Sequence, residues 1–254
     1  MTSRLDINAD LGEYDGVPPE SALALLRTVT SANIACGWHA GNAVSMRLTV
    51  AEAAALGVQI GAHPSYPDRE GFGRRTMPMT PAEVTDAVAH QVHALCAVAA
   101  AERTSVRHVK PHGALYNLAC RDRHVADAIT AGIVLVDAGL ALYAPSASAL
   151  AEAGRAACLR VVAEGFLDRA YEDDGTLTPR AVPGAVRHDA EAACQRAIAW
   201  AQTGAVLTRT GRTLVLAVDT LCVHGDTPDA VAIAAQVRAA LAAAGIRLAP
   251  SLEP

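Results

Sequence analysis

Strand-length apolar runs alternate with long alanine-rich helical stretches along most of this chain. The alternation repeats about seven times, an order that predicts parallel strands joined by crossover helices. The strand runs are continuously apolar, as expected for a sheet that is covered on both faces. A closed barrel and an open doubly wound sheet both fit this pattern. The expected strands are residues 5–10, 32–36, 58–63, 107–112, 140–145, 160–165 and 214–220.

Local signals mark the helices and two exceptions to the alternation. Thr80, Pro81 and Glu83 predict a helix start with an N-cap, a proline at the first position and a capping acid. Residues 166–188 are too polar and too rich in glycine and proline for a helix, and residues 206–214 predict a hairpin. The expected helices are residues 20–29, 44–56, 81–102, 123–136, 147–157, 190–202 and 228–244.

Length and composition favour one domain over two. The 254 residues are a common length for a single α/β barrel, and no Ser/Gly/Pro tract is long enough to act as a linker. The chain is 52% hydrophobic and 19% charged, which is enough apolar material for a sizeable core. We therefore expect residues 1–254 to form one α/β barrel domain.

The charge and the cysteines limit where the protein acts. A formal net charge of −5 argues against nucleic acid and anionic membranes as partners. The N-terminus lacks the features of a secretory signal, and no apolar run approaches a membrane span in length. The six cysteines include no close pair, which indicates reduced thiols. We expect a cytoplasmic protein.

Polar side chains end almost every expected strand. In parallel α/β folds these strand ends converge on one face, where substrates bind. A single such residue is usually a helix cap, but six strands share the feature. Lys110, the only lysine, and Glu164 lie within apolar runs where an unpaired charge would be costly. The candidate site residues are Asn8, Asp10, His39, His63, Lys110, His112, Glu164, Arg169, Asp219, His224 and Asp226.

Other kinds of site are weighed against this cluster. Neither standard glycine-rich nucleotide cradle is present. Cys36 and Cys222 lie near histidines in sequence, yet buried packing is the more common fate of such cysteines. Residues that are distant in sequence could together bind a divalent metal ion. This inference rests only on their shared position at strand ends. The candidate ligands are Asp10, His39, His63 and His112, with His224 nearby in the same group.

Long motifs surround the candidate residues. They cover residues 8–13, 30–41, 61–64, 71–75, 109–116, 163–171 and 219–227. In these motifs the sequence resembles the LamB/YcsF family, over nearly the whole chain. The sequence departs from the family pattern at Asn42, Ala43 and Ser65 and in a shorter segment after Glu13, and none of these positions is a candidate residue.

The resemblance implies a TIM-like (β/α) barrel of about seven parallel strands, similar to the glycoside hydrolase/deacetylase barrels. It also implies hydrolytic ring opening of 5-oxo-L-proline (pyroglutamate) to L-glutamate, coupled to ATP hydrolysis, together with partner subunits B and C. ATP, with its Mg²⁺, could bind this chain or only those partners. A homo-oligomer is compatible with the sequence.

Charge type suggests a role for each candidate. Asp10 or Glu164 would act as general base on water, with burial raising its pKa. Lys110 and Arg169 would stabilise oxyanion or phosphate charge. The remaining candidates position the substrate, move a proton, bind a metal or orient these partners: Asn8, His39, His63, His112, Asp219, His224 and Asp226.

Two rival classes remain open. One is a metal-dependent amide or carbohydrate deacetylase that acts alone. The other is a noncatalytic binding or regulatory subunit. For the hydrolase, we expect Lys110→Ala and Asp10→Asn to abolish ATP-dependent glutamate formation while the fold stays intact.

Overall fold

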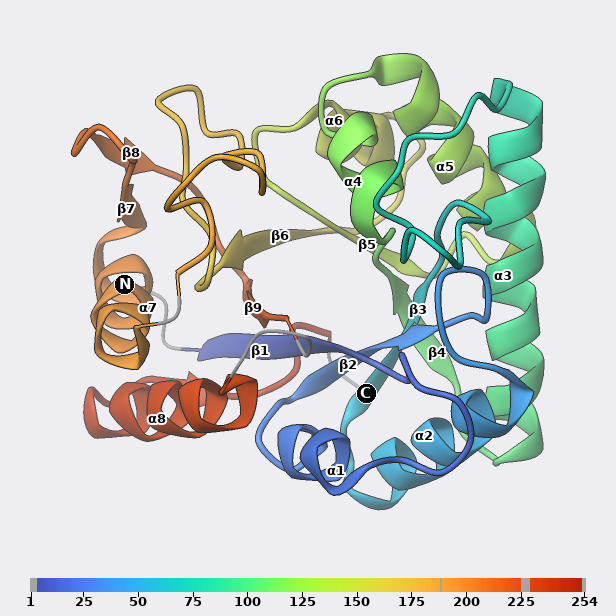
Figure 1. Cartoon of the computed structure of the whole chain (residues 1–254), viewed down its shortest axis with the longest axis horizontal. Helices are drawn as coiled ribbons and strands as arrows, with labels where there is room; N and C mark the ends of the chain where they lie inside the picture. The colour runs from blue at the N-terminus through green and yellow to red at the C-terminus, as the bar shows by residue number, and fades with distance from the viewer. Residues whose placement is uncertain (1–3, 188, 225–228, 253–254) are drawn as a thin grey trace.

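Seven parallel strands close into a barrel (Figure 1). The structure, a computed structural model, describes residues 4–187, 189–224 and 229–252. Each strand pairs in parallel with the next, and the last pairs back with the first, which confirms the expected TIM-like barrel. In order around the barrel the strands are β1 (Arg4–Leu11), β2 (Ser31–Ala35), β3 (Gln59–His63), β4 (Val106–Val109), β5 (Ala141–Ala144), β6 (Val161–Phe166) and β9 (Thr220–Val223).

Helices surround the strands (Figure 1). They are α1 (Glu20–Leu26), α2 (Ala43–Ala55), α3 (Pro81–Ala101), α4 (Gly113–Ala119), α5 (Arg123–Val136), α6 (Ala149–Ala156), α7 (Ala190–Thr203) and α8 (Ala230–Ala243). The 21-residue α3 is long and apolar enough to cross a membrane by composition alone. It packs instead against α5, and its buried Val84, Val88 and Leu95 belong to the hydrophobic core.

Side-chain caps mark the starts of α2, α3, α5, α6 and α7. Thr80 and Glu83 form the expected capping box of α3, with Pro81 as the first helical residue. Asn42 caps α2 by accepting from the backbone N–H groups of Val44 and Ser45, so the departure from the family pattern there preserves the helix start. Each cap satisfies backbone donors that a helix start would otherwise leave unpaired.

The barrel interior is polar, unlike the branched aliphatic filling usual in such barrels. Hydrogen bonds cross it between strands that are not neighbours. Tyr143 of β5 donates to Asp6 of β1, at 3.1 Å, and His108 of β4 donates to Asn33 of β2, at 2.8 Å. Gly61 of β3 makes room for this imidazole, because a Cβ there would lie 2.0 Å from His108 Nε2. Polar side chains therefore line the barrel axis.

The prediction of a seventh strand at residues 214–220 is wrong. The barrel strand is β9 (Thr220–Val223), and Leu214 lies in β8 (Thr213–Val215), which pairs antiparallel with β7 (Ala205–Leu207). Apolar residues lie in both segments, at 214–218 and 221–223, so apolar content does not show which of them is the hairpin arm and which the barrel strand. The expected hairpin is confirmed. Helix α4 and β10 (Arg247–Leu248), which pairs with the start of β1, were not anticipated.

Candidate functional site

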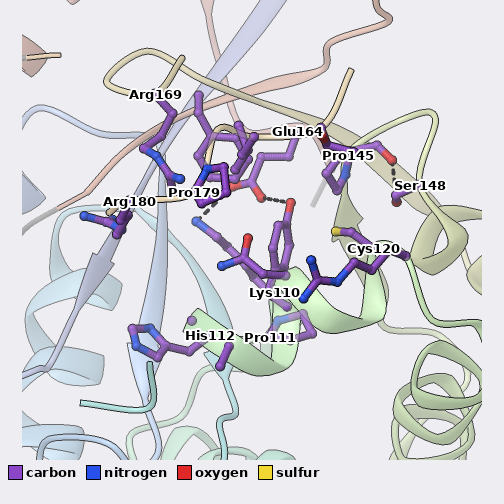
Figure 2. A pocket seen from close by; sticks show the side chains of 18 of the residues that line it. Lys110, Pro111, His112, Cys120, Pro145, Ser148, Glu164, Arg169, Pro179 and Arg180 are labelled. Carbon is purple, nitrogen blue, oxygen red and sulfur yellow. Dashed lines mark hydrogen bonds and ion pairs between the residues drawn. The ribbon is translucent and has the colours of Figure 1, made fainter. Parts of the chain in front are cut away.

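A cavity of about 780 Å³ opens where the strands of the barrel end (Figure 2). Its floor includes Asp10, Lys110 and Glu164, and His63 and His112 also line it. The segment between β6 and α7 contributes Arg169 and Arg180 to the opposite wall. Residues from most of the barrel strands therefore share one cavity, as the convergence of parallel strand ends requires.

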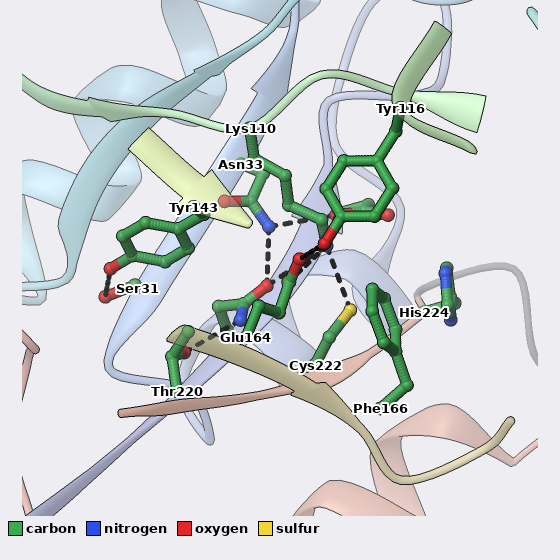
Figure 3. Close-up of polar contacts among 12 residues, drawn as sticks. Ser31, Asn33, Lys110, Tyr116, Tyr143, Glu164, Phe166, Thr220, Cys222 and His224 are labelled. Carbon is green, nitrogen blue, oxygen red and sulfur yellow. Dashed lines mark hydrogen bonds and ion pairs between the residues drawn. The ribbon is translucent and has the colours of Figure 1, made fainter. Parts of the chain in front are cut away.

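Lys110 is the centre of the site (Figure 3). Its buried Nζ lies 3.0 Å from Asp10 Oδ1, 2.9 Å from Glu164 Oε1, 3.0 Å from Cys222 Sγ and 3.3 Å from Asn8 Oδ1. The contact with Glu164 is an ion pair without hydrogen-bond alignment. The single lysine of the chain thus joins strands β1, β4, β6 and β9 from inside the barrel.

Charge pairing fixes the protonation of this centre. Burial opposes the Lys110 ammonium, but the Asp10 and Glu164 carboxylates and the hydrogen bond to Cys222 raise its pKa well above the ordinary value. Burial likewise opposes the Asp10 carboxylate, yet His63 and Lys110 hold the pKa of Asp10 well below its ordinary value. Burial thus acts on Asp10 in the expected direction, but the pKa of Asp10 is lowered overall, because the interactions with His63 and Lys110 outweigh the loss of solvent.

A chain of amides and one imidazole orients the carboxylate of Asp10. Asn33 Nδ2 donates to Asp10 Oδ1 at 2.9 Å and to Asn8 Oδ1 at 2.7 Å. Asn8 Nδ2 donates to Thr220 Oγ1 at 2.8 Å. His108 donates to Asn33 as a neutral imidazole, since burial lowers its pKa to about 3. This network engages Asp10 Oδ1, whereas Asp10 Oδ2 lies 3.4 Å from His63 Nε2.

Tyr116 holds the second carboxylate. Its hydroxyl, on α4, donates to Glu164 Oε2 at 2.6 Å, and burial raises the pKa of this phenol well above its ordinary value. Helix α4 follows β4 directly, so the same turn of chain carries both Lys110 and Tyr116 to Glu164. Cys222 stays a thiol, because burial raises its pKa well above the ordinary value. A thiolate nucleophile is therefore disfavoured here.

Histidines gather beside Asp10. His63 Nδ1 donates to the Lys110 carbonyl at 2.7 Å, and His112 Nε2 donates to the Phe72 carbonyl at 2.9 Å. The other ring nitrogens, His63 Nε2 and His112 Nδ1, lie 2.9 Å apart. His39 stacks on His112 with ring centroids 3.8 Å apart. Donor atoms of Glu13, His39, His63 and His112 all lie within 4.8 Å of one another, a cluster able to hold a metal ion.

Arg169 and His224 form the far wall. His224 Nδ1 lies 2.8 Å from Asp168 Oδ2, just beyond β6. Arg169 is 3% exposed and donates from its Nη2 to the Thr178 carbonyl at 2.7 Å. Within the described part of the chain its Nε has no hydrogen-bond partner. A buried guanidinium with an unused donor in a cavity wall is suited to bind an anion.

Most predicted residues converge, but Asp219 does not join the cluster. Asp219 precedes β9 instead of ending a strand; it is exposed, and its carboxylate accepts from the Ala163 backbone N–H at 2.9 Å. The misplaced seventh strand explains this error. Asp226 lies outside the described residues. Sequence reasoning missed Glu13, Asn33, His108 and Tyr116, although Glu13, Asn33 and Tyr116 lie inside the motifs quoted for the family resemblance.

The fold and the site define a closed α/β barrel with a buried charged centre where substrates bind in this architecture. The sequence profile of the LamB/YcsF family matches residues 5–254, and the chain belongs to this family. The predicted resemblance is thereby confirmed.

Relatives of this chain match it over nearly its whole length. The A subunit of the 5-oxoprolinase of Nitrobacter winogradskyi is 49% identical over 248 residues, which cover 97% of each chain. Its counterpart in Bordetella pertussis is 47% identical over 249 residues, covering 98% of this chain and 99% of the relative. The crystal structure of a lactam utilization protein from Thermus thermophilus superposes with a TM-score of 0.91 at 42% identity, covering 97% of this chain and 99% of that one.

Proposed function

We propose that this chain is the lactam-opening subunit of an ATP-dependent 5-oxoprolinase, which hydrolyses 5-oxo-L-proline to L-glutamate. The observation that carries the proposal is the buried Lys110 ammonium held between Asp10 and Glu164 at the floor of the cavity. Relatives named as the A subunit of 5-oxoprolinase, and one named as a lactam utilization protein, support the choice of substrate.

The chemistry of the ring explains why such a centre is needed. A five-membered lactam is resonance-stabilised, and its carbonyl carbon is a poor electrophile. A fixed ammonium near the lactam oxygen stabilises negative charge on that oxygen, including the charge of a phosphoryl group attached to it, as water attacks the ring carbon. In the proposed reaction Lys110 supplies this charge, and Asp10 and Glu164 keep it protonated and in place.

Water attack also needs a base. Asp10 Oδ1 is occupied by Lys110 and Asn33, so Asp10 Oδ2 is the oxygen placed to accept a proton from water. The lowered pKa of Asp10 makes it a weak base. A weak base suffices when the electrophile is already activated, which ATP achieves by phosphorylating the lactam oxygen. We assign this activation to partner subunits B and C, with ATP and Mg²⁺ bound there or at the junction with this chain.

The cavity has room for such an intermediate. Its volume of about 780 Å³ lies in the upper part of the roughly 300–1,000 Å³ range of ligand pockets and far exceeds one five-membered ring. Arg74, Arg121 and Arg180 line it in addition to Arg169. A phosphorylated lactam carries a carboxylate and a phosphate, and several arginines suit such a ligand.

We expect Arg169 to bind the substrate carboxylate. Arg169→Gln should raise the KM for 5-oxo-L-proline by roughly 10- to 150-fold, the equivalent of about 1.5–3 kcal/mol for a hydrogen bond to a charged group. Binding of 2-pyrrolidinone, the same ring without the carboxylate, should be unchanged. Arg123→Gln, at a 49% exposed site on α5, is the matched control. An equal loss for both lactams would remove this role from Arg169.

An omission assay tests the proposed function. The purified chain, candidate subunits B and C, ATP, Mg²⁺ and 5-oxo-L-proline are combined, and each component is left out in turn while glutamate is measured. Glutamate should form only in the complete mixture. Formation of glutamate with this chain omitted would reject the proposal.

The two rival functions give different results in the same mixtures. A metal-dependent amide or carbohydrate deacetylase, favoured by the histidine cluster, would release acetate from acetylated substrates without ATP or partners. A binding or regulatory subunit would bind 5-oxo-L-proline while its Lys110 and Asp10 variants left turnover unchanged. For the proposed enzyme we infer a cytoplasmic location, because its substrate, ATP and reduced thiols belong to that compartment.

A further inference from the structure

Two imidazole nitrogens, His63 Nε2 and His112 Nδ1, face each other beside Asp10. His63 Nδ1 and His112 Nε2 each point at a backbone carbonyl, which can only accept, so these nitrogens carry the ring hydrogens. His63 Nε2 and His112 Nδ1 are therefore the nitrogens left to bind a cation, and they lie 2.9 Å apart. Two lone pairs at this distance repel each other unless a cation lies between or beside them.

Two carboxylates lie close to this pair of nitrogens. Glu13 Oε1 lies 3.5 Å from His112 Nδ1, and Asp10 Oδ2 lies 3.4 Å from His63 Nε2. Bonds of ~2.0–2.1 Å at tetrahedral angles would place neighbouring zinc ligands roughly 3.3–3.4 Å apart. The measured spacings of 2.9, 3.4 and 3.5 Å bracket that separation, so small side-chain adjustments would complete a metal-binding geometry.

The surroundings of the two histidines match those of metal ligands. A histidine that binds a metal through one nitrogen usually donates its other N–H to a backbone carbonyl or a carboxylate, which fixes the ring and the tautomer. His63 and His112 both do so. Both are at most 5% exposed, and they line the cavity with Glu13 and Asp10, so an ion there could contact a ligand.

His39 supports the cluster without joining it. Its ring is parallel to that of His112, at 3° and 3.8 Å, so the in-plane lone pairs of the two rings cannot converge on one ion. His39 Nε2 instead lies 3.1 Å from Glu13 Oε1, where a neutral ring donates to the carboxylate. His39 thus acts as a positioning residue for Glu13.

We propose that His63, His112 and Glu13 bind a divalent cation of the zinc class, with Asp10 beside it and His39 orienting Glu13. Nitrogen and carboxylate ligands in this number select Zn²⁺ or its analogues over Mg²⁺ and Ca²⁺, which prefer all-oxygen sites. This site goes beyond the proposed ring opening, which needs no metal other than the Mg²⁺ that accompanies ATP.

The test measures binding on the isolated, full-length chain, without ATP, lactam or partners. Protein freed of metal is titrated with Zn²⁺ by calorimetry and with Co²⁺ by visible absorption, whose intensity reports four-coordinate geometry. We expect one ion per chain. His112→Gln and His63→Gln should each weaken Zn²⁺ binding at least ~100-fold, and His39→Gln by about 10- to 100-fold, as for residues that orient a ligand.

Controls separate binding from folding and from turnover. His93→Gln, at an exposed position on α3, should bind Zn²⁺ like the unaltered chain, and thermal melting checks that each variant folds. Failure of the metal-free chain to bind Zn²⁺ or Co²⁺, or equal affinity in His112→Gln, would overturn the metal site. A proton shared between His63 Nε2 and His112 Nδ1 would then explain their 2.9 Å separation. Either result leaves the ring-opening proposal standing, because glutamate formation is measured separately.

Discussion

Lys110→Met is expected to abolish glutamate formation by the complete enzyme, with a loss of at least ~10²–10³ in kcat for one removed charge-stabilising donor. The variant keeps most of the side-chain volume but removes the ammonium that contacts Asp10 and Glu164 at 3.0 and 2.9 Å. Turnover is measured with the partner subunits and ATP present. Full activity in this variant would exclude Lys110 from the reaction.

The same change should also lower the free energy of unfolding, a cost that the sequence-based expectation of an intact fold for Lys110→Ala did not include. Removal of one partner from a buried ion pair costs roughly 3–5 kcal/mol, because the remaining charge is left uncompensated. Chemical denaturation should show this loss in Lys110→Met. The double variant Lys110→Met/Glu164→Gln should recover part of the stability and none of the activity. That pattern distinguishes a catalytic loss from mere unfolding.

Asp10→Asn is expected to lower kcat by about 10²–10³ with a smaller effect on stability. The amide oxygen can still accept from Lys110 and Asn33, so the local hydrogen bonds survive while the charge and the base are lost. Asp86→Asn, exposed on α3, is the matched control. Unchanged turnover in Asp10→Asn would mean that another group accepts the proton of water.

The pH dependence of unfolding gives a second measurement on this variant. The pKa of Asp10 is depressed in the folded chain, so its contribution to stability is fully present above the unfolded value near 3.8. That contribution is lost as pH falls through the lower folded pKa. The stability difference between the unaltered chain and Asp10→Asn should therefore be constant near neutral pH and shrink only below about pH 4.

The alternation of apolar runs predicted the barrel well, because six of its seven strands are bounded by helices with clear caps or turns. The prediction of the seventh strand failed where the apolar run of residues 214–218 precedes Asp219 and Thr220 with no turn signal between them. A hairpin arm and a barrel strand differ in whether their side chains face solvent or the barrel interior. The number of apolar residues in a run does not show which way its side chains face. The displacement of Asp219 from the site followed directly from that error.

The residues at the centre of the site were predictable from their positions at strand ends, but the hydrogen bonds and ion pairs among them were not. Strand ends indicated Asp10, Lys110 and Glu164. The period of two along a strand could also have placed His108 inside, since it shares a face with Lys110, whereas Asn33 has no predicted residue on its strand. The prediction treated these strands as continuously apolar and therefore overlooked their alternating polar residues. The sign of the Asp10 pKa shift could not be predicted, because it depends on distances to cations from other strands.

The polar barrel axis has a consequence for how this protein can change in evolution. In most barrels the scaffold and the chemistry are separate, since loops carry function above an aliphatic core. Here His108 and Asn33 fill the interior and also orient Asp10, so the same hydrogen bonds serve both roles. A new activity would require coordinated exchange of several interior residues. Descendants of this barrel should therefore diversify at the cavity rim while the axis stays fixed.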